Sequence, residues 1–173
     1  MAEGAAWGTL DAKPTEGPLR SDIWPASCSP RLLKRTAKAR RREGRFVWSD
    51  AWSGRVIGAA IEVHRALGPG LLESVYQLAL EAELRMREVP FERQKPVPIR
   101  YRGLVLDAGL RLDFVVAGEL IVELKSVSQL IDIHEAQLLT YLKMTGCAVG
   151  LLINFNVPVL RRGIRRLVHR VPD

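Results

Sequence analysis

The sequence predicts an α/β fold, in which a mixed β-sheet is flanked by helices, and three observations carry this prediction. Residues 53–67 and 71–87 repeat apolar side chains at intervals of three and four, the pattern of amphipathic helices. Residues 91–125 hold short runs of alternating polar and apolar residues separated by turn residues, which is typical of strands. A third helical pattern, residues 130–145, precedes a nearly continuous apolar run, residues 147–154. This order predicts a sheet with helices on its faces.

The first helix is expected to begin near Ser53, a candidate N-cap, and to end before the helix breaker Gly68-Pro69-Gly70. Its His64 is interpreted as a histidine at the edge of the core rather than as a ligand. In the second helix one apolar stripe is predicted to be buried, and a neighbouring face is more polar. The stripe consists of Leu72, Val75, Leu78, Ala79, Ala82 and Met86, and the neighbouring face of Glu73, Tyr76, Gln77 and Leu80.

The strand patterns differ in their expected positions in the sheet. Pro96 and Pro98 interrupt the pattern of residues 91–101 and favour an edge strand. Arg102-Gly103 is a predicted turn. The apolar run 147–154 is typical of a buried internal strand. One further strand is expected within residues 160–171, a stretch with five arginines and no acidic residue.

Residues 111–125 predict a β-hairpin whose register decides the chemistry of the domain. Side chains alternate on both sides of Ala117-Gly118. If Gly118 is the centre, Asp113 lies opposite Glu123 and both project to one face, whereas a strict two-residue turn would separate the carboxylates. We therefore predict a three-residue loop or a glycine bulge. Lys125 lies two residues past Glu123, on the same face of its strand.

Two carboxylates at this separation are costly unless a cation or a proton lies between them. Mg²⁺, with Mn²⁺ as a substitute, is the expected cation because it binds one or two carboxylates together with waters. Asp113, Glu123 and Lys125 have the spacing D-x9-E-x-K, which suits phosphodiester hydrolysis. The carboxylates would hold the metal, and the lysine would orient water or stabilise negative charge. The simpler alternative is a solvated charged face.

The hairpin, with Gln137 and Tyr141 on the following helix, resembles the PD-(D/E)xK nuclease superfamily. More closely, the chain is similar to the GxxExxY family within it, with the naming motif present as Gly70, Glu73 and Tyr76 in GPGLLESVY. Other similar stretches are IGAAIEVHRALGPG, RLDFVV, LIVELKSV, HEAQLLTYLKMTG, GLLINFN and RRGIRRLV, so that the resemblance spans about Trp52 to Val168. It implies a restriction-endonuclease-like core with the order αβββαβ. Leu112 stands where the superfamily name has Pro.

The resemblance also implies roles for individual residues. Asp113, Glu123 and Glu73 would bind the metal, and Lys125 would be the catalytic lysine. Glu73 thereby gains a second interpretation, since its place in the first helical turn is also explained by the helix dipole. Further residues are expected to support the site or to contact nucleic acid: Tyr76, Gln137, Tyr141, Arg161 and Arg165.

The basic charge is concentrated in the N-terminal part of the chain. Residues 1–49 hold ten Lys/Arg and five Asp/Glu, a net of +5, whereas residues 50–173 hold sixteen and fourteen, a net of +2. Residues 1–49 are expected to be a disordered basic extension and residues 50–173 the nuclease-like domain. The extension is read as a solvated tail or residues upstream of the real start, with a nucleic-acid-binding arm or a targeting signal as alternatives.

The function predicted from the sequence is a Mg²⁺-dependent nuclease whose partner is nucleic acid, DNA ahead of RNA. The alternative is a non-catalytic nucleic-acid-binding or assembly module on a nuclease fold. No apolar run approaches the ~20 residues of a membrane span, and no signal peptide is visible. With only two cysteines in unrelated contexts, a cytoplasmic location is expected. The sequence leaves the oligomeric state open.

Overall fold

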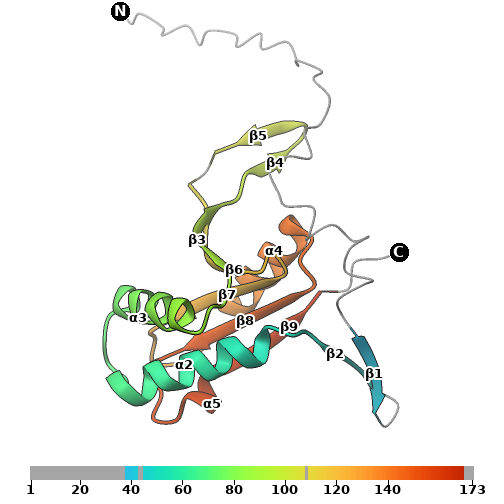
Figure 1. The fold of residues 1–173 in the computed structure, drawn as a ribbon. Helices are drawn as coiled ribbons and strands as arrows, with labels where there is room; N and C mark the ends of the chain where they lie inside the picture. The colour runs from blue at the N-terminus through green and yellow to red at the C-terminus, as the bar shows by residue number, and fades with distance from the viewer. Residues whose placement is uncertain (1–37, 43–44, 108, 170–173) are drawn as a thin grey trace, which may run out of the picture.

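The computed structural model describes residues 38–42, 45–107 and 109–169, and its main body is a five-stranded sheet with helices on both faces (Figure 1). The strand order is β3-β6-β7-β8-β9, in which β7 and β8 are parallel and the other neighbours antiparallel. The elements of this body are α2 (Ser53–Leu67), α3 (Glu73–Met86), β3 (Phe91–Pro96), β6 (Arg111–Val116), β7 (Leu120–Lys125), α4 (Asp132–Thr145), β8 (Val149–Asn154), α5 (Leu160–Gly163) and β9 (Ile164–Val168). The predicted mixed α/β fold with the order αβββαβ is confirmed.

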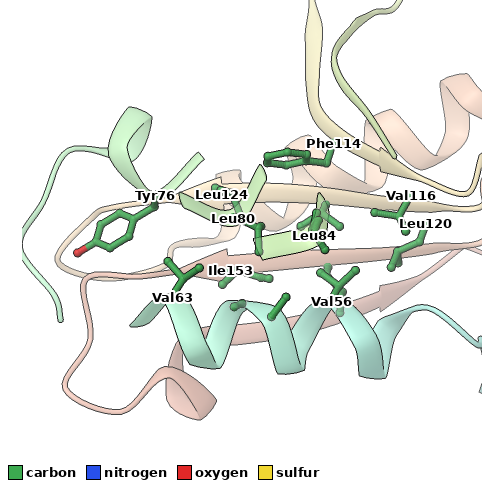
Figure 2. Packing of buried hydrophobic residues seen from close by; sticks show 14 of the residues in the cluster. Val56, Val63, Tyr76, Leu80, Leu84, Phe114, Val116, Leu120, Leu124 and Ile153 are labelled. Carbon is green, nitrogen blue, oxygen red and sulfur yellow. The ribbon is translucent and has the colours of Figure 1, made fainter. Parts of the chain in front are cut away.

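Two apolar clusters hold the helices against the sheet. On one face α2 and α3 pack on β6, β7 and β8 through residues that include Val56, Leu80 and Ile153 (Figure 2). On the other face α4 packs through Leu138 and Leu142. The predicted edge position of β3 and the internal position of β8 are both confirmed. His64 also lies as predicted, because its Nε2 is 2.8 Å from the Val157 carbonyl oxygen at the edge of the core.

The buried face of α3 differs from the predicted one. The stripe expected to be buried is largely exposed, with Leu72 74% and Met86 72% accessible. Tyr76, Leu80 and Leu84 are buried instead. The helix carries two apolar stripes, and the one that includes Tyr76 faces the sheet because the Tyr76 ring stacks on Phe155, with 4.5 Å between ring centroids.

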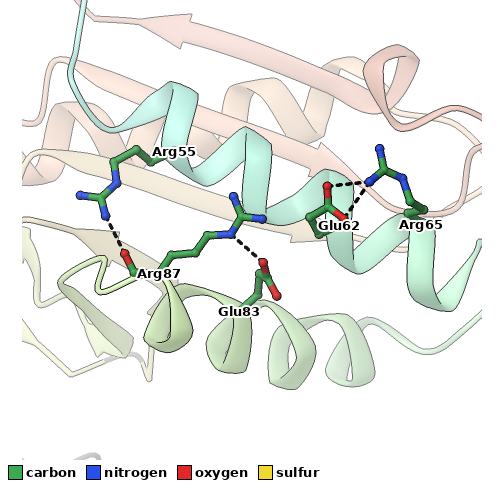
Figure 3. A network of polar contacts seen from close by, with 5 residues as sticks. All are labelled: Arg55, Glu62, Arg65, Glu83 and Arg87. Atoms are coloured by element: carbon green, nitrogen blue, oxygen red, sulfur yellow. Dashed lines mark hydrogen bonds and ion pairs between the residues drawn. The ribbon is translucent and has the colours of Figure 1, made fainter.

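Polar contacts at the helix ends fix the α2–α3 pair (Figure 3). Arg55 of α2 donates from Nη2 to the main-chain oxygen of Arg87, just after α3, and Arg87 pairs with Glu83 at 2.6 Å. At the start of α2 the N-cap residue is Trp52, not the predicted Ser53, and the side chain that bonds the first turn is that of Asp50. The Asp50 carboxylate accepts hydrogen bonds from the main-chain N–H and the hydroxyl of Ser53, and it pairs with Arg166 of β9.

Part of the predicted N-terminal extension has regular structure. Strands β1 (Lys38–Arg42) and β2 (Arg45–Ser49) pair as an antiparallel hairpin where the sequence predicts none. A further hairpin, β4 (Ile99–Tyr101) with β5 (Leu104–Leu106), forms around the predicted turn at Arg102-Gly103. Residues 1–37 of the extension lie outside the described residues. None of the helices in the described part is long and apolar enough to cross a membrane.

Gly163→Ala is expected to destabilise the domain by about 1–3 kcal/mol. A methyl group at Gly163 would clash with the main-chain oxygen of Asn154 and come within 2.9 Å of Val157 Cγ2, and the backbone atom cannot move aside cheaply. The matched control is Gly54→Ala in α2, where nothing lies within 4 Å and the better helix propensity of alanine should be neutral or stabilising. Urea unfolding of both variants measures the difference, and equal midpoints would contradict the close packing of α5 on β8.

Candidate active site

The site is organised by the point at which β6 and β7 stop pairing. The two strands pair from Val116–Leu120 to Phe114–Val122, a register centred on Gly118, as predicted. Ala117 and Gly118 both have positive φ, and the Glu119 N–H donates to the Val116 oxygen, so the turn holds one residue more than a two-residue hairpin. The same register carries Asp113 to the position opposite Glu123.

Beyond Phe114 the Asp113 side chain replaces a main-chain acceptor. The N–H of Leu124 in β7 donates to Oδ2 of Asp113 at 2.8 Å. The carboxylate therefore occupies the space between the ends of the two strands, and only 7% of Asp113 is exposed. Burial raises the pKa of Asp113, although the Leu124 N–H and the charge of Lys125 act in the opposite direction.

Glu123 and Lys125 form an ion pair beside this carboxylate. Lys125 Nζ lies 2.7 Å from Oε1 of Glu123. The other oxygen, Oε2, is buried and has no hydrogen-bond partner in the part of the chain that the structure describes. Burial, together with the charge of Asp113, raises the pKa of Glu123 to about 7, against the opposing effect of Lys125. An unpartnered buried carboxylate oxygen is costly, so Glu123 Oε2 is suited to a proton or a cation.

Lys125 is positioned to remain a cation at neutral pH. Burial lowers the pKa of its ammonium group, but the hydrogen bond to Glu123 and the charges of Glu73 and Asp113 outweigh burial and raise that pKa above its usual value. The three carboxylates that act on Lys125 also act on one another. The site is thus a cluster of carboxylates around the ammonium group of Lys125. Because the pKa of this group is raised, Lys125 is charged at neutral pH and does not act as a base.

Glu73 stands at the first turn of α3, on the flank of the cluster. Burial raises its pKa, which Lys125 and a hydrogen bond from the Ser126 main chain oppose and Asp113 reinforces. Among the described residues, however, no three His, Cys, Asp or Glu side chains are close enough together to hold one metal ion. The structure therefore places Glu73 within electrostatic reach of the other two carboxylates without assembling a three-carboxylate set.

Two glutamines that the sequence analysis did not assign to the site hold Asp113. Gln77 of α3 donates from Nε2 to Asp113 Oδ1 at 2.8 Å, and Gln94 of β3 does so at 3.2 Å. The position of Gln77, four residues after Glu73 on one helix face, is a signal that the sequence contains. Gln94 has no such signal, because its place depends on the pairing of β3 with β6 and on its own unusual φ of 52°.

Asn154, at the end of β8, is a second polar residue without a sequence signal. It is 1% exposed, and its side-chain amide bonds both the N–H and the oxygen of Val127. Phe155 donates its N–H to the Lys125 oxygen at 2.9 Å. These contacts fix the chain directly after Lys125, so that the lysine has a defined backbone from which to reach Glu123.

Tyr76 belongs to the apolar cluster between the sheet and the helices α2 and α3 (Figure 2). It is fully buried, its hydroxyl donates to the Gly68 oxygen at 2.6 Å, and it accepts the Leu71 N–H at 3.2 Å. The hydroxyl thus closes the turn that leads into α3. Its connection with the site is indirect, since this turn sets the direction in which α3 begins and therefore the position of Glu73.

The other predicted supporting residues lie around the site at different distances. Gln137 donates to the hydroxyl of Tyr141 at 2.5 Å. Burial raises the pKa of Tyr141, and the charges of Glu123 and Asp113 raise it further, against the hydrogen bond from Gln137 and the charge of Lys125. Arg161 is exposed on α5. Arg165 of β9 is paired with Leu152 of β8, which is paired with Glu123, so its backbone is about 10 Å from that of Glu123.

A comparison with protein families identifies the superfamily to which this fold belongs. The family model described as the PD-(D/E)XK nuclease superfamily matches residues 50–167. The chain belongs to this superfamily. Comparisons with curated proteins and with solved structures gave no match. Nucleases of this superfamily act on nucleic acid and usually use divalent metals.

The residues present can supply two carboxylate ligands to a divalent cation, and water would supply the other ligands. Glu123 Oε2 offers a buried oxygen without a partner, and Asp113 lies in the next position across the hairpin. Mg²⁺ needs only one or two protein carboxylates, because it keeps several waters in its octahedral shell. Two carboxylates and waters are therefore a sufficient donor set, even though no three carboxylates meet in the part of the chain that the structure describes.

Gln77→Ala is expected to weaken divalent-metal binding about 10-fold or more, because residues that orient a metal ligand typically contribute this much. The variant removes the 2.8 Å hydrogen bond that holds Asp113 Oδ1 and leaves Gln94 as the remaining amide donor. Calorimetric titration with Mn²⁺ measures the affinity. Leu78→Ala is the matched control, since this neighbouring side chain is exposed. Equal affinities in the two variants would show that the Asp113 orientation does not depend on Gln77.

Proposed function

We propose that the domain hydrolyses phosphodiester bonds in nucleic acid with the help of Mg²⁺, for which Mn²⁺ can substitute, and that DNA is the preferred substrate. The observation that carries the proposal is the meeting of Asp113, Glu123 and Lys125 where β6 and β7 separate, with Oε2 of Glu123 buried and unpartnered. A purely structural ion pair would leave no reason to keep that oxygen out of water.

Asp113 and Glu123 would hold the cation, and Glu73 would contribute through a bound water. The chemistry that a divalent ion supplies in such a site is polarisation of a phosphoryl oxygen and a lower pKa of bound water. Lys125, held as an ammonium group by the carboxylates, places positive charge where the phosphate gains negative charge in the transition state. Gln77 and Gln94 keep the Asp113 carboxylate in one orientation before substrate arrives.

We further assign the chain to the GxxExxY family within the superfamily. The physical support is the way in which the three motif residues act together. Gly70 has a φ of 97°, which favours glycine, and lies in the turn that the Tyr76 hydroxyl closes. That turn begins α3 at Glu73, the residue that flanks the carboxylates. The motif thus builds a support for one acidic side chain.

The decisive experiment incubates the full chain with single-stranded, duplex and branched DNA, and with RNA, in the presence of Mg²⁺ or Mn²⁺. Wild type is expected to cleave at least one of these substrates. EDTA should abolish this cleavage, and so should the combined substitution Asp113→Asn and Glu123→Gln. If wild type and the double variant are equally inert on all substrates with either metal, the hydrolytic function is rejected.

A non-catalytic nucleic-acid-binding module is the second candidate. It is favoured by the fact that three acidic side chains do not meet at one point within the described residues, and by the arginines of α5 and β9, which can track phosphates. Binding without metal that survives the double substitution, with no cleavage by wild type, would support it. The cytoplasmic location stays a prediction from the sequence.

A further inference from the structure

We propose that the ribbon formed by β4 and β5 is a binding arm for single-stranded nucleic acid, with bases on its apolar face and phosphates on its arginines. The proposal rests on the proposed function, because it concerns how the substrate of that site is held. Figure 1 shows the ribbon projecting from the layered body beyond the end of β3. It forms a sheet of its own, and among the described residues its two strands pair with each other and with no other strand.

The ribbon exposes large apolar side chains to solvent, which is unusual for residues of this kind. Tyr101, Leu104 and Val105 are 56%, 58% and 57% accessible. An isolated two-stranded hairpin is marginally stable in water, so these side chains gain little from the fold that displays them. Large apolar side chains gathered on one projecting element mark a binding surface more often than scattered single ones do.

The ribbon is attached at the candidate active site. It is inserted between β3 and β6, the strands that carry Gln94 and Asp113. At its base Arg111 donates from Nη1 to the main-chain oxygen of Gln94 at 3.2 Å, which ties the two ends of the insertion together. A strand of nucleic acid lying on the ribbon would therefore lead toward the carboxylates.

The two faces of the ribbon differ in chemistry. Paired residues share a face in an antiparallel ladder. The pairs Ile99–Leu106 and Tyr101–Leu104 give one apolar face with an aromatic ring, and Arg100 lies opposite Val105 on the other. Arg102, in the turn, holds its guanidinium over one face of the Tyr101 ring, 5.5 Å from the ring centre. Single-stranded nucleic acid stacks its bases on aromatic rings, with cation–π contributions from arginine, so the other face of this ring can take a base.

The segment that contains the ribbon has a net positive charge, whereas most of the domain has a net negative charge. Residues 93–111 hold five Lys/Arg and one Asp, a net of +4, and residues 161–170 hold five Arg and no acid, a net of +5. Because residues 50–173 total +2, the remainder of the domain carries −7. Arg93 and Lys95 pair with Glu81 and Glu92. Arg100 and Arg102 form no ion pair within the described part of the chain, so they are available for phosphates.

In the turn of the ribbon an arginine occupies a backbone position that disfavours it. Arg102 has a φ of 48° and Gly103 a φ of 82°. Two-residue turns of this kind prefer Asn, Asp or Gly at the first position, because other side chains are strained at positive φ. Strained backbone of this kind clusters at binding and active sites.

Unpaired bases fit this face better than a duplex does. In a duplex the base faces are stacked inside and the grooves present polar edges, which an apolar face of tyrosine, leucine and isoleucine does not match. A single strand presents base faces and phosphates together, which matches apolar and arginine faces on one thin element.

The test measures binding without metal, by fluorescence anisotropy of an end-labelled oligothymidine and of a labelled duplex in EDTA. Wild type is expected to bind the single strand more tightly. Tyr101→Ala should weaken this binding about fivefold or more, whereas Tyr101→Phe, which keeps the ring, should bind as wild type does. Arg100→Ala combined with Arg102→Ala should reduce the slope of log Kd against log salt by about 1.4. Arg65→Ala, on the exposed side of α2, is the matched control and should change nothing.

Three results would contradict the proposal that the ribbon binds single strands. One is an unchanged single-strand affinity of Tyr101→Ala. Another is that the duplex binds more tightly than the single strand and the ribbon variants have no effect. The third is a change in oligomeric state on gel filtration with unchanged affinity, which would make the ribbon a protein interface. Failure of the two proposals is distinguishable. Tyr101-dependent binding without cleavage rejects the hydrolytic function alone, and cleavage with normal binding by Tyr101→Ala rejects the arm alone.

Discussion

Lys125→Ala is expected to reduce metal-dependent cleavage by about 100-fold or more while the protein remains folded. The expected size is that of removing one preorganised group that stabilises charge in a transition state. Lys125 Nζ lies 2.7 Å from Oε1 of Glu123, and the carboxylates around it raise the pKa of Lys125, so its positive charge is held inside the cluster.

The comparison needs a lysine whose loss is structurally mild. Lys143→Ala, exposed on α4, is the matched control and should cleave at the wild-type rate. Lys125→Arg keeps the charge and changes the shape, so a partial rate would separate charge from geometry. Thermal unfolding followed by circular dichroism shows whether each variant is folded. A folded Lys125→Ala protein with the wild-type rate would remove Lys125 from the mechanism.

The register of the central hairpin could be predicted because it depends on local information alone. Alternation of side chains fixes which residues share a face, and the parity of the turn at Gly118 fixes which residues face each other across the strands. The sequence also places a glycine, Gly118, at one of the two turn positions with positive φ; Ala117 occupies the other. For Asp113 and Glu123 the structure therefore adds distances and burial to an arrangement already predicted.

The buried face of α3 could not be predicted from its own residues. Two stripes of comparable apolar content run along this helix, and periodicity does not distinguish them. The choice is made by Phe155, which is far away in the sequence and stacks on Tyr76. The same choice turns Gln77 toward Asp113. A resemblance that singled out Glu73 and Tyr76 contained this information, whereas hydrophobicity alone favoured the opposite face.

Gln94 and Asn154 show the other limit of prediction. Each acts through a contact between distant parts of the chain: Gln94 reaches a carboxylate 19 residues later, and Asn154 reaches a loop 27 residues earlier. Polar residues in strands are common, and only the tertiary pairing distinguishes these two from solvated ones. For the same reason the charged cluster could be predicted from the sequence, whereas the amides that support it could not.

Glu123→Gln is expected to stabilise the metal-free protein at pH 8 by up to about 3 kcal/mol. The pKa of Glu123 is about 7 in the folded protein against 4.5 as the ordinary value, and each unit of difference corresponds to about 1.4 kcal/mol. The raised pKa means that the folded state binds the proton more tightly than the unfolded state. This stabilisation is complete below about pH 4.5 and is lost as the pH rises through about 7.

Urea unfolding in EDTA at pH 5 and pH 8 measures the effect. Wild type should lose stability between the two values, and Glu123→Gln, which cannot ionise, should lose less. Glu92→Gln is the matched control, because this exposed side chain on β3 should leave the pH dependence of wild type unchanged. If Glu123→Gln is less stable than wild type at pH 8, the ionised carboxylate stabilises the fold through Lys125, and the unpartnered oxygen is not a source of instability.

The same unfolding measurements can be repeated in the presence of Mg²⁺. A ligand that binds only the folded state raises the free energy of unfolding in proportion to the logarithm of its concentration. Mg²⁺ should therefore stabilise wild type most above pH 7, where Glu123 is ionised, and should stabilise Glu123→Gln far less. The acidic cluster then has a clear physical meaning: the domain tolerates an unfavourable buried carboxylate because the cation that neutralises it is needed for function, as stability is commonly sacrificed at active sites.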